Sequence, residues 1–315
     1  MEERGGGAVR RARWGTAVAL TAAVVFLSAA DAIPLVAIPM AVVLAAVPFP
    51  NRWKWAALGL LLWIVGIAYP AGPLGNLSRG WALLLGGGFL VATLARPRWG
   101  VLPRSLLALL LAVVMGGVAM LLAGGWADLD SLVRSHLLTV TDTAFRGLRP
   151  AKADSAAVGQ FAETARRVAL LQWQVFPALL ALQSLAALGL ASWAVARLRR
   201  AEGGAFTLRP LREFRFNDQL VWVVVLGLAL LVLPLDAVAT RLGYNALFFM
   251  GGLYALRGFG VIVFLAGGAP SFLTVMFGAI MAVFLYPLVL TAAVLVGLGD
   301  TWLDVRGRAA AAPPA

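Results

Sequence analysis

The 315-residue sequence contains no cysteine and only one histidine, His136. A chain without cysteine forms no disulfide bond, no thiolate metal site and no thiol redox centre. A single histidine also excludes metal sites and proton relays that need several histidines. The GxxxxGK[ST] loop of ATPases and the HExxH and GxSxG motifs of hydrolases are missing as well. We therefore expect no metal, no cofactor and no enzymatic activity from this chain.

Charged residues are scarce, at 13% of the chain, whereas hydrophobic residues make up 62%. Soluble domains average about 25% charged and about 45–50% apolar residues. The mean hydropathy of +0.90 points the same way, so the sequence predicts a multi-pass protein of the cell membrane, in contact with membrane lipids. The longest polar segment, at about 126–167, is too short for a catalytic domain of ordinary size.

Nine apolar segments divide the chain. They are residues 15–30, 33–49, 55–69, 81–95, 105–123, 171–196, 220–235, 244–266 and 271–297. A span needs about 20 residues, so the shorter segments must include flanking residues, and the second contains prolines that each remove a backbone donor. The first also resembles a signal peptide, but the eight further segments favour a retained first span. The sequence predicts an all-α, polytopic helical bundle with eight or nine spans, forming one membrane domain over residues 1–315.

The segment at about 126–167 has apolar residues at helical spacing with charged residues between them. Arg149-Pro150 should break it into two amphipathic helices, the second running into the sixth span. We expect this pair on the outer membrane face, either as a structural cover or as a lid over a binding cavity. The tail at about 309–315 is expected to be disordered.

The net charge of +12 comes from 26 Lys and Arg, mostly in short loops, which is typical of the positive-inside bias of membrane proteins and not of nucleic-acid binding. Alternate loops are rich and poor in these residues, and the short poor loops hold only Arg79 and Arg241. This pattern predicts a cytoplasmic N-terminus. Nine spans would place the C-terminal Arg306 and Arg308 outside, against the bias, whereas eight would place them inside; both counts remain open.

The segment at about 197–218 is the most basic surface on the predicted cytoplasmic side, and it includes Arg209, Arg212 and Arg215. It is interpreted either as a topology anchor among anionic lipid headgroups or as a docking site for an acidic cytoplasmic or membrane protein partner.

Arg257 lies near the middle of an apolar segment, where an arginine costs about 2.5–3.5 kcal/mol on insertion scales. No acidic residue stands at a comparable depth in another segment. Asp300 and Asp304 follow the last span, and with Arg306 nearby they are interpreted as a solvated helix end instead of a general acid and base. Arg257 should therefore bind a small anionic ligand, in a site shared with Tyr254 and Asn245, or backbone carbonyls freed by a helix break.

The C-terminal third contains a recognisable pattern of residues. A span ending in basic residues leads to a Pro- and Arg-rich linker, then to Leu-Tyr-Ala-Leu-Arg-Gly at 253–258, and to a closing Gly-Leu-Gly-Asp-Thr-Trp-Leu-Asp-Val-Arg at 297–306. This pattern resembles the YybS-like family of uncharacterised predicted bacterial membrane proteins. That family looks distantly like the substrate-binding membrane subunits of energy-coupling-factor transporters, which implies a compact helical bundle that depends on partner subunits for ATP.

Two function hypotheses follow. The first is a small-molecule-binding or transport component without its own ATPase. The alternative is a structural or assembly scaffold of a membrane complex that binds no substrate, and an enzyme acting on lipid is a distant third. A mid-depth cavity lined by Arg257, Tyr254 and Asn245 would favour the first hypothesis, whereas a solidly packed interior would favour the second.

Overall fold

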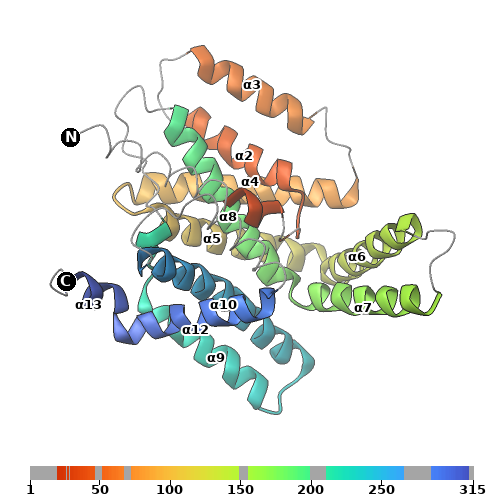
Figure 1. Cartoon of the computed structure of the whole chain (residues 1–315). Coiled ribbons are helices and arrows are strands. Elements are labelled where there is room, and N and C mark those ends of the chain that lie inside the picture. The colour runs from red at the N-terminus through yellow and green to blue at the C-terminus, as the bar shows by residue number, and fades with distance from the viewer. Residues whose placement is uncertain are drawn as a thin grey trace.

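The computed structural model describes residues 20–25, 27, 29–46, 52–66, 72–148, 155–198, 211–265 and 285–311, and within these ranges it contains helices but no strand (Figure 1). The chain is helical at residues 20–25 before the first labelled element. The elements that follow are α2 (Ala32–Ala46), α3 (Arg52–Gly66), α4 (Pro73–Ala95), α5 (Val101–Ala123), α6 (Trp126–Leu148), α7 (Ser155–Gln174), α8 (Phe176–Leu198), η2 (Leu211–Glu213), η3 (Asp218–Leu220), α9 (Val221–Val232), α10 (Ala237–Leu265), α12 (Tyr286–Leu303) and α13 (Val305–Ala311).

Four of these helices, α4, α5, α8 and α10, are long and apolar enough to cross a membrane. Shorter apolar helices lie at Ala32–Ala46, Asp218–Val232 and Leu288–Leu303. The multi-pass helical membrane bundle is confirmed at this level, but the count of eight or nine spans is not. Much of the first and ninth apolar segments falls outside the described residues.

Local sequence signals explain where the long helices begin and end. α4 starts with Pro73 at its first position, where a missing N–H costs nothing. α5 ends at Gly124, which adopts φ +64 and donates its N–H to the carbonyl of Leu121. Glycine takes this left-handed conformation readily, and the turn that it makes leads directly into α6.

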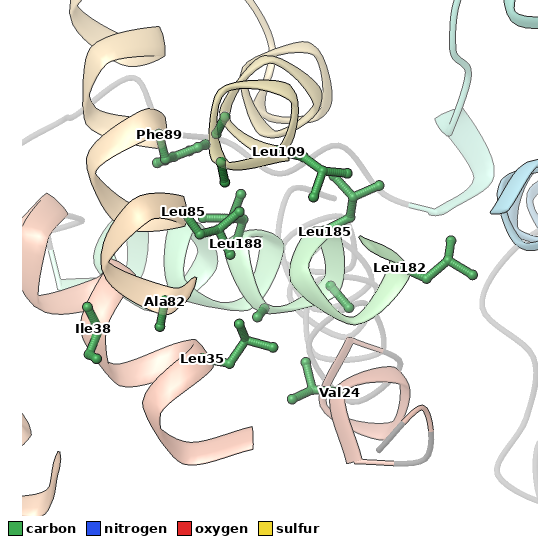
Figure 2. Close-up of a cluster of buried hydrophobic side chains, with 14 of the residues drawn as sticks. Val24, Leu35, Ile38, Ala82, Leu85, Phe89, Leu109, Leu182, Leu185 and Leu188 are labelled. Carbon is green, nitrogen blue, oxygen red and sulfur yellow. The ribbon is translucent and has the colours of Figure 1, made fainter. Parts of the chain in front are cut away.

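The N-terminal half of the bundle is held by an apolar core in which α8 lies beside α2, α4 and α5 (Figure 2). Leu35, Leu85, Phe89 and Leu188 are among its most deeply buried side chains. α2 stays helical through Pro39, and its packing against α4 and α8 provides the cover that its prolines require.

A buried glutamine joins this core to the chain before α2. The Gln183 Oε1 atom accepts hydrogen bonds from the N–H groups of Ala29 and Ala30, at 3.0 and 2.7 Å. Its Nε2 donates to the carbonyls of Val24 and Ala30, at 2.8 and 2.9 Å. The backbone leaves the helix at 29–31, so Gln183 supplies the partners that buried peptide groups need.

The C-terminal half depends on close helix contacts made at glycines. α10 packs against both α9 and α12. A Cβ atom on Gly258 of α10 would overlap the carbonyl oxygen of Ala293 in α12, and one on Gly297 of α12 would overlap the carbonyl oxygen of Tyr254. Only glycine lets two helix backbones approach this closely.

α6 and α7 form a helical hairpin that we call the arm. Two helices in the predicted amphipathic segment are confirmed, but α7 extends to Gln174, and the break expected at Arg149-Pro150 lies outside the described residues. In Figure 1 the arm projects away from the other helices instead of folding over them. The main packing of α6 is with α7 itself, so the contacts of the described chain do not support a lid over the bundle. The location of the pair on the outer membrane face stays a prediction.

The C-terminal end of the chain also departs from expectation. Residues 309–311, predicted to be disordered, belong to α13. α13 lies against the linker segment at 211–218, since Arg306 donates to the carbonyls of Arg212 and Phe214, each at 3.0 Å. Arg306 thus lies beside the basic linker, but the count of eight or nine spans is not confirmed, because residues 266–284 lie outside the described part of the chain.

Candidate functional site: a buried charge network

Arg257 is the centre of a charge network at the linker end of α10, and its side chain is only 3% exposed. Its Nε donates to Oδ2 of Asp300 at 3.0 Å, and its Nη2 donates to the main-chain carbonyl of Asp300 at 3.2 Å. Its Nη1 donates to Oδ1 of Asp218 at 2.6 Å. The guanidinium is therefore bound on two sides by carboxylates of the chain itself.

Asp300 corrects two sequence-based expectations. Its side chain is 0% exposed, so it does not belong to a solvated helix end. Since α12 continues to Leu303 and packs closely along α10, Asp300 lies beside Arg257 although the two are 43 positions apart. The expectation that no carboxylate reaches the depth of Arg257 is wrong for this reason.

Arg306 completes the network from α13, and its side chain is 4% exposed. Its Nη2 donates to Oδ2 of Asp300 at 2.8 Å, and its Nη1 binds the two linker carbonyls described above. The chain can bring Arg306 back toward Asp300 because Asp304 adopts φ +41 between α12 and α13. The Asp304 carboxylate accepts from Arg215 at 2.7 Å, and both side chains are about half exposed.

Two aromatic rings pack against the network. The Arg257 guanidinium carbon lies 5.4 Å from the centre of the Phe216 ring, within the range of a cation–π contact. Phe216 in turn meets Tyr254 edge to face, with ring centres 5.1 Å apart. Tyr254 is 1% exposed, so it contributes to a packed interior around Arg257.

The network combines two arginines with two aspartates, of which only Asp218 is largely exposed. Burying such charges costs several kcal/mol each unless they are paired and hydrogen-bonded. Here the pairs join α10, α12, α13 and the linker. The arrangement can therefore hold the linker in position. Most of its charged atoms pair with one another, whereas Asp300 Oδ1 and Arg306 Nε are buried without a hydrogen-bond partner in the described chain.

Asn245 lies far from this network. It is three helical turns before Arg257 on α10, roughly 18 Å along the helix at 1.5 Å per residue. Its Oδ1 accepts from the N–H of Ala178 at 2.9 Å, and its Nδ2 donates to the carbonyls of Gln174 and Arg241, at 2.9 and 2.8 Å. The expected grouping of Asn245 with Arg257 and Tyr254 is wrong, although Tyr254 and Arg257 do share one place.

Asn245 belongs to a second polar cluster, which we call the arm clamp, at the junction between α7 and α8. Pro177 has no N–H, so the carbonyl of Trp173 loses its helical partner, and Arg241 Nη2 donates to that carbonyl at 3.1 Å. Asn245 likewise inserts between the Gln174 carbonyl and the Ala178 N–H. The helix break is satisfied by side chains from α10.

The arm clamp extends to α6 through Asp130. Its Oδ1 accepts from Arg241 Nη1 at 2.8 Å and from the Trp173 indole at 3.1 Å. Arg134 and Arg241 lie 5.2 and 4.8 Å from the Trp173 ring. This cluster was not predicted from the sequence, although Pro177 inside an apolar segment signals that the helix needs hydrogen-bond partners from elsewhere.

The residues predicted to dock a partner are Arg209, Arg212 and Arg215. Arg209 lies outside the described residues. Arg212 is half exposed and lies 3.8 Å from Glu213, while Arg215 pairs with Asp304. Asp218, Phe216, Asp300 and Arg306 were not predicted as site residues, although the run closing at Arg306 had been singled out as a pattern.

Comparison with known proteins gives one result. The family model described as "Predicted membrane protein (DUF2232)" matches residues 15–301, which is most of the chain and includes Asp300. Neither the curated proteins nor the solved structures contain a significant match.

Proposed function

The chain belongs to the DUF2232 family of predicted membrane proteins, and from that premise we propose that it is a structural or assembly component of a membrane complex. Its linker segment at 211–218 acts as a platform that presents Arg212 and Arg215 to an acidic cytoplasmic partner. One observation carries the proposal: buried arginines from two different helices hold this short segment in place.

Burying those arginines has an energetic cost. A loop that connects two spans can lie in the solvent, where it needs no buried charged residues to hold it. This chain instead buries Arg257, Arg306 and Asp300, and a set of buried charges is weak support for stability by itself. A fixed position of the linker explains why such a network is present. Exposed basic side chains on a fixed backbone favour recognition of an acidic surface.

The other hypothesis is a small-molecule-binding or transport component, as the resemblance to energy-coupling-factor subunits implies. Its expected site loses support because Arg257 is bound by Asp300 and Asp218, and Asn245 serves the arm clamp. The chain also lacks a nucleotide-binding motif. We therefore expect the purified protein, alone in liposomes, to show no concentrative uptake.

Charge reversal tests the platform. Arg212→Glu with Arg215→Glu should abolish chemical cross-linking in cells to a cytoplasmic or membrane partner, identified by mass spectrometry of the cross-linked species. The control pair, Arg96→Glu with Arg98→Glu, makes the same charge change in another exposed loop and should leave the cross-link intact. Equal effects of both pairs, or gradient-driven accumulation of a substrate by the protein alone, would overturn the proposal.

The platform also requires a cytoplasmic linker. Because the native chain has no cysteine, a single introduced cysteine shows directly on which side of the membrane its position lies. A cysteine at Arg98 or Ala205 should be shielded from an impermeant thiol reagent in intact cells, and one at Ala153 should react. Labelling of the Arg98 position from outside would reverse the orientation.

A further inference from the structure

Arg215, one of the two platform arginines, is already paired with a carboxylate of the chain itself. Its Nη2 lies 2.7 Å from Oδ1 of Asp304, and the two side chains are 48% and 57% exposed. We propose that Asp304 masks the platform, and that an acidic segment of the partner binds by displacing the Asp304 carboxylate from Arg215. This inference rests on the proposed function, because it concerns how the same site is regulated.

Both members of the pair stand on backbone that the rest of the chain holds in place. The carbonyl of Phe214 accepts from Arg306 at 3.0 Å, and the ring of Phe216 packs against the buried charge network. The neighbours of Arg215 on either side are therefore held. Asp304, with φ +41, lies at the junction of α12 and α13. The masking carboxylate is thus positioned beside Arg215 before a partner arrives.

Gly307 provides the space in which the masking carboxylate lies. A Cβ atom on Gly307 would overlap the Asp304 carboxylate, and Oδ2 is the nearest atom. An alanine at this position keeps the charge of Asp304 but pushes its carboxylate away from where Arg215 meets it. The position of the masking group and its charge can therefore be changed separately.

The exposure of the pair makes the mask reversible. An ion pair in contact with solvent contributes little, so a carboxylate of the partner can take the place of Asp304. The apparent affinity of the partner falls only in proportion to the time that Arg215 spends paired. The Arg257–Asp300 pair, at 3% and 0% exposed, offers no such access.

Arg212 is held less closely than Arg215. Its Nε lies 3.8 Å from Oε1 of Glu213, which is beyond hydrogen-bond distance. Arg212 can therefore make the first contact with an acidic surface, and Arg215 contributes once Asp304 has moved. The platform favours a partner segment that offers at least two carboxylates, one for each arginine.

Binding of a fluorescein-labelled oligoglutamate peptide tests the mask, by fluorescence anisotropy with the full-length protein in nonionic detergent at low salt. Asp304→Asn should tighten binding about two- to fivefold, the range for release of one exposed ion pair, because asparagine also accepts a positive φ. Gly307→Ala should tighten binding too, although it leaves the net charge unchanged. Glu213→Gln is the matched control, since it removes the same charge from the linker but leaves the Asp304 pair intact. It should change Kd by less than about twofold.

The Arg215→Gln background separates the mask from a general charge effect. Neither Asp304→Asn nor Gly307→Ala should tighten binding in that background. A gain by Asp304→Asn that persists there, or no gain by Gly307→Ala in the otherwise unchanged protein, would overturn the mask.

The same titrations distinguish failure of the mask from failure of the platform. Peptide binding that is lost in Arg212→Glu with Arg215→Glu, but is unaffected by Asp304→Asn, would keep the platform and reject the mask. Absence of peptide binding by the unchanged protein and by every variant would reject both. Thermal unfolding in the same detergent shows that each variant is folded.

Discussion

Arg241 and Arg257, both on α10, make similar interactions but differ in how deeply they are buried. Each binds an aspartate and main-chain carbonyls from another part of the chain. The Arg257–Asp300 pair is 3% and 0% exposed, whereas the Arg241–Asp130 pair is 34% and 40% exposed. Exposed ion pairs are worth about 0–1 kcal/mol, while breaking a buried pair costs about 3–5 kcal/mol. The linker end of α10 should therefore tolerate change far less than the arm end.

The largest effect is expected at the shared carboxylate. Asp300→Asn leaves the guanidinium groups of Arg257 and Arg306 buried without their common counter-charge. It should lower the free energy of unfolding by about 3–5 kcal/mol, seen as a large drop in the thermal unfolding temperature in detergent.

Two variants give this prediction its controls. Asp218→Asn changes an aspartate that is 59% exposed and should cost less than about 1 kcal/mol. Arg257→Leu should lose stability as well, but less than Asp300→Asn, because Arg306 still neutralises Asp300. If Asp300→Asn unfolds at the temperature of the unchanged protein, the network does not stabilise the fold.

The second-largest effect is expected at the close contact between α10 and α12, which buries the charge network. Gly258→Ala places a methyl group where the Ala293 carbonyl lies, so α10 and α12 must separate near Arg257. We expect a loss of about 1–3 kcal/mol, measured by thermal unfolding.

Gly251→Ala is the matched substitution on the same helix. A Cβ atom there meets nothing within 4 Å, and alanine gains up to about 1 kcal/mol over glycine in helix propensity. The two variants should therefore shift stability in opposite directions. A similar loss for both would point to helix flexibility instead of the interhelical contact.

The smallest effects belong to the arm clamp. Asn245→Ala removes hydrogen bonds to the Gln174 carbonyl and the Ala178 N–H, and each is worth about 0.5–1.5 kcal/mol. The loss should show as faster amide hydrogen exchange around 174–178. Asp130→Asn should cost less than about 1 kcal/mol and should lose its effect at high salt. Salt-insensitive destabilisation by Asp130→Asn would show that the clamp is as buried as the network around Arg257.

The predictions from sequence succeeded where a property belongs to a continuous segment. The two amphipathic helices followed from periodicity within about 40 residues, and the apolar helices followed from hydropathy. Predictions failed where two distant segments had to be placed together. Asp300 was assigned to a solvated end because its own neighbours are polar, and Asn245 was grouped with Arg257 because both lie in one apolar segment.

The sequence by itself determined that this chain is an all-helical membrane protein, because 62% hydrophobic residues in long runs need helices to satisfy their backbone groups in lipid. It also showed that Arg257 requires a partner, since an arginine at that depth is costly. Which partner it has was decided only by the tertiary structure. The glycine contacts between α10 and α12 bring Asp300 alongside Arg257, and the turn at Asp304 returns Arg306 to the same carboxylate. Interactions between residues 43 positions apart depend on how helices pack, and no local pattern in the sequence records that packing.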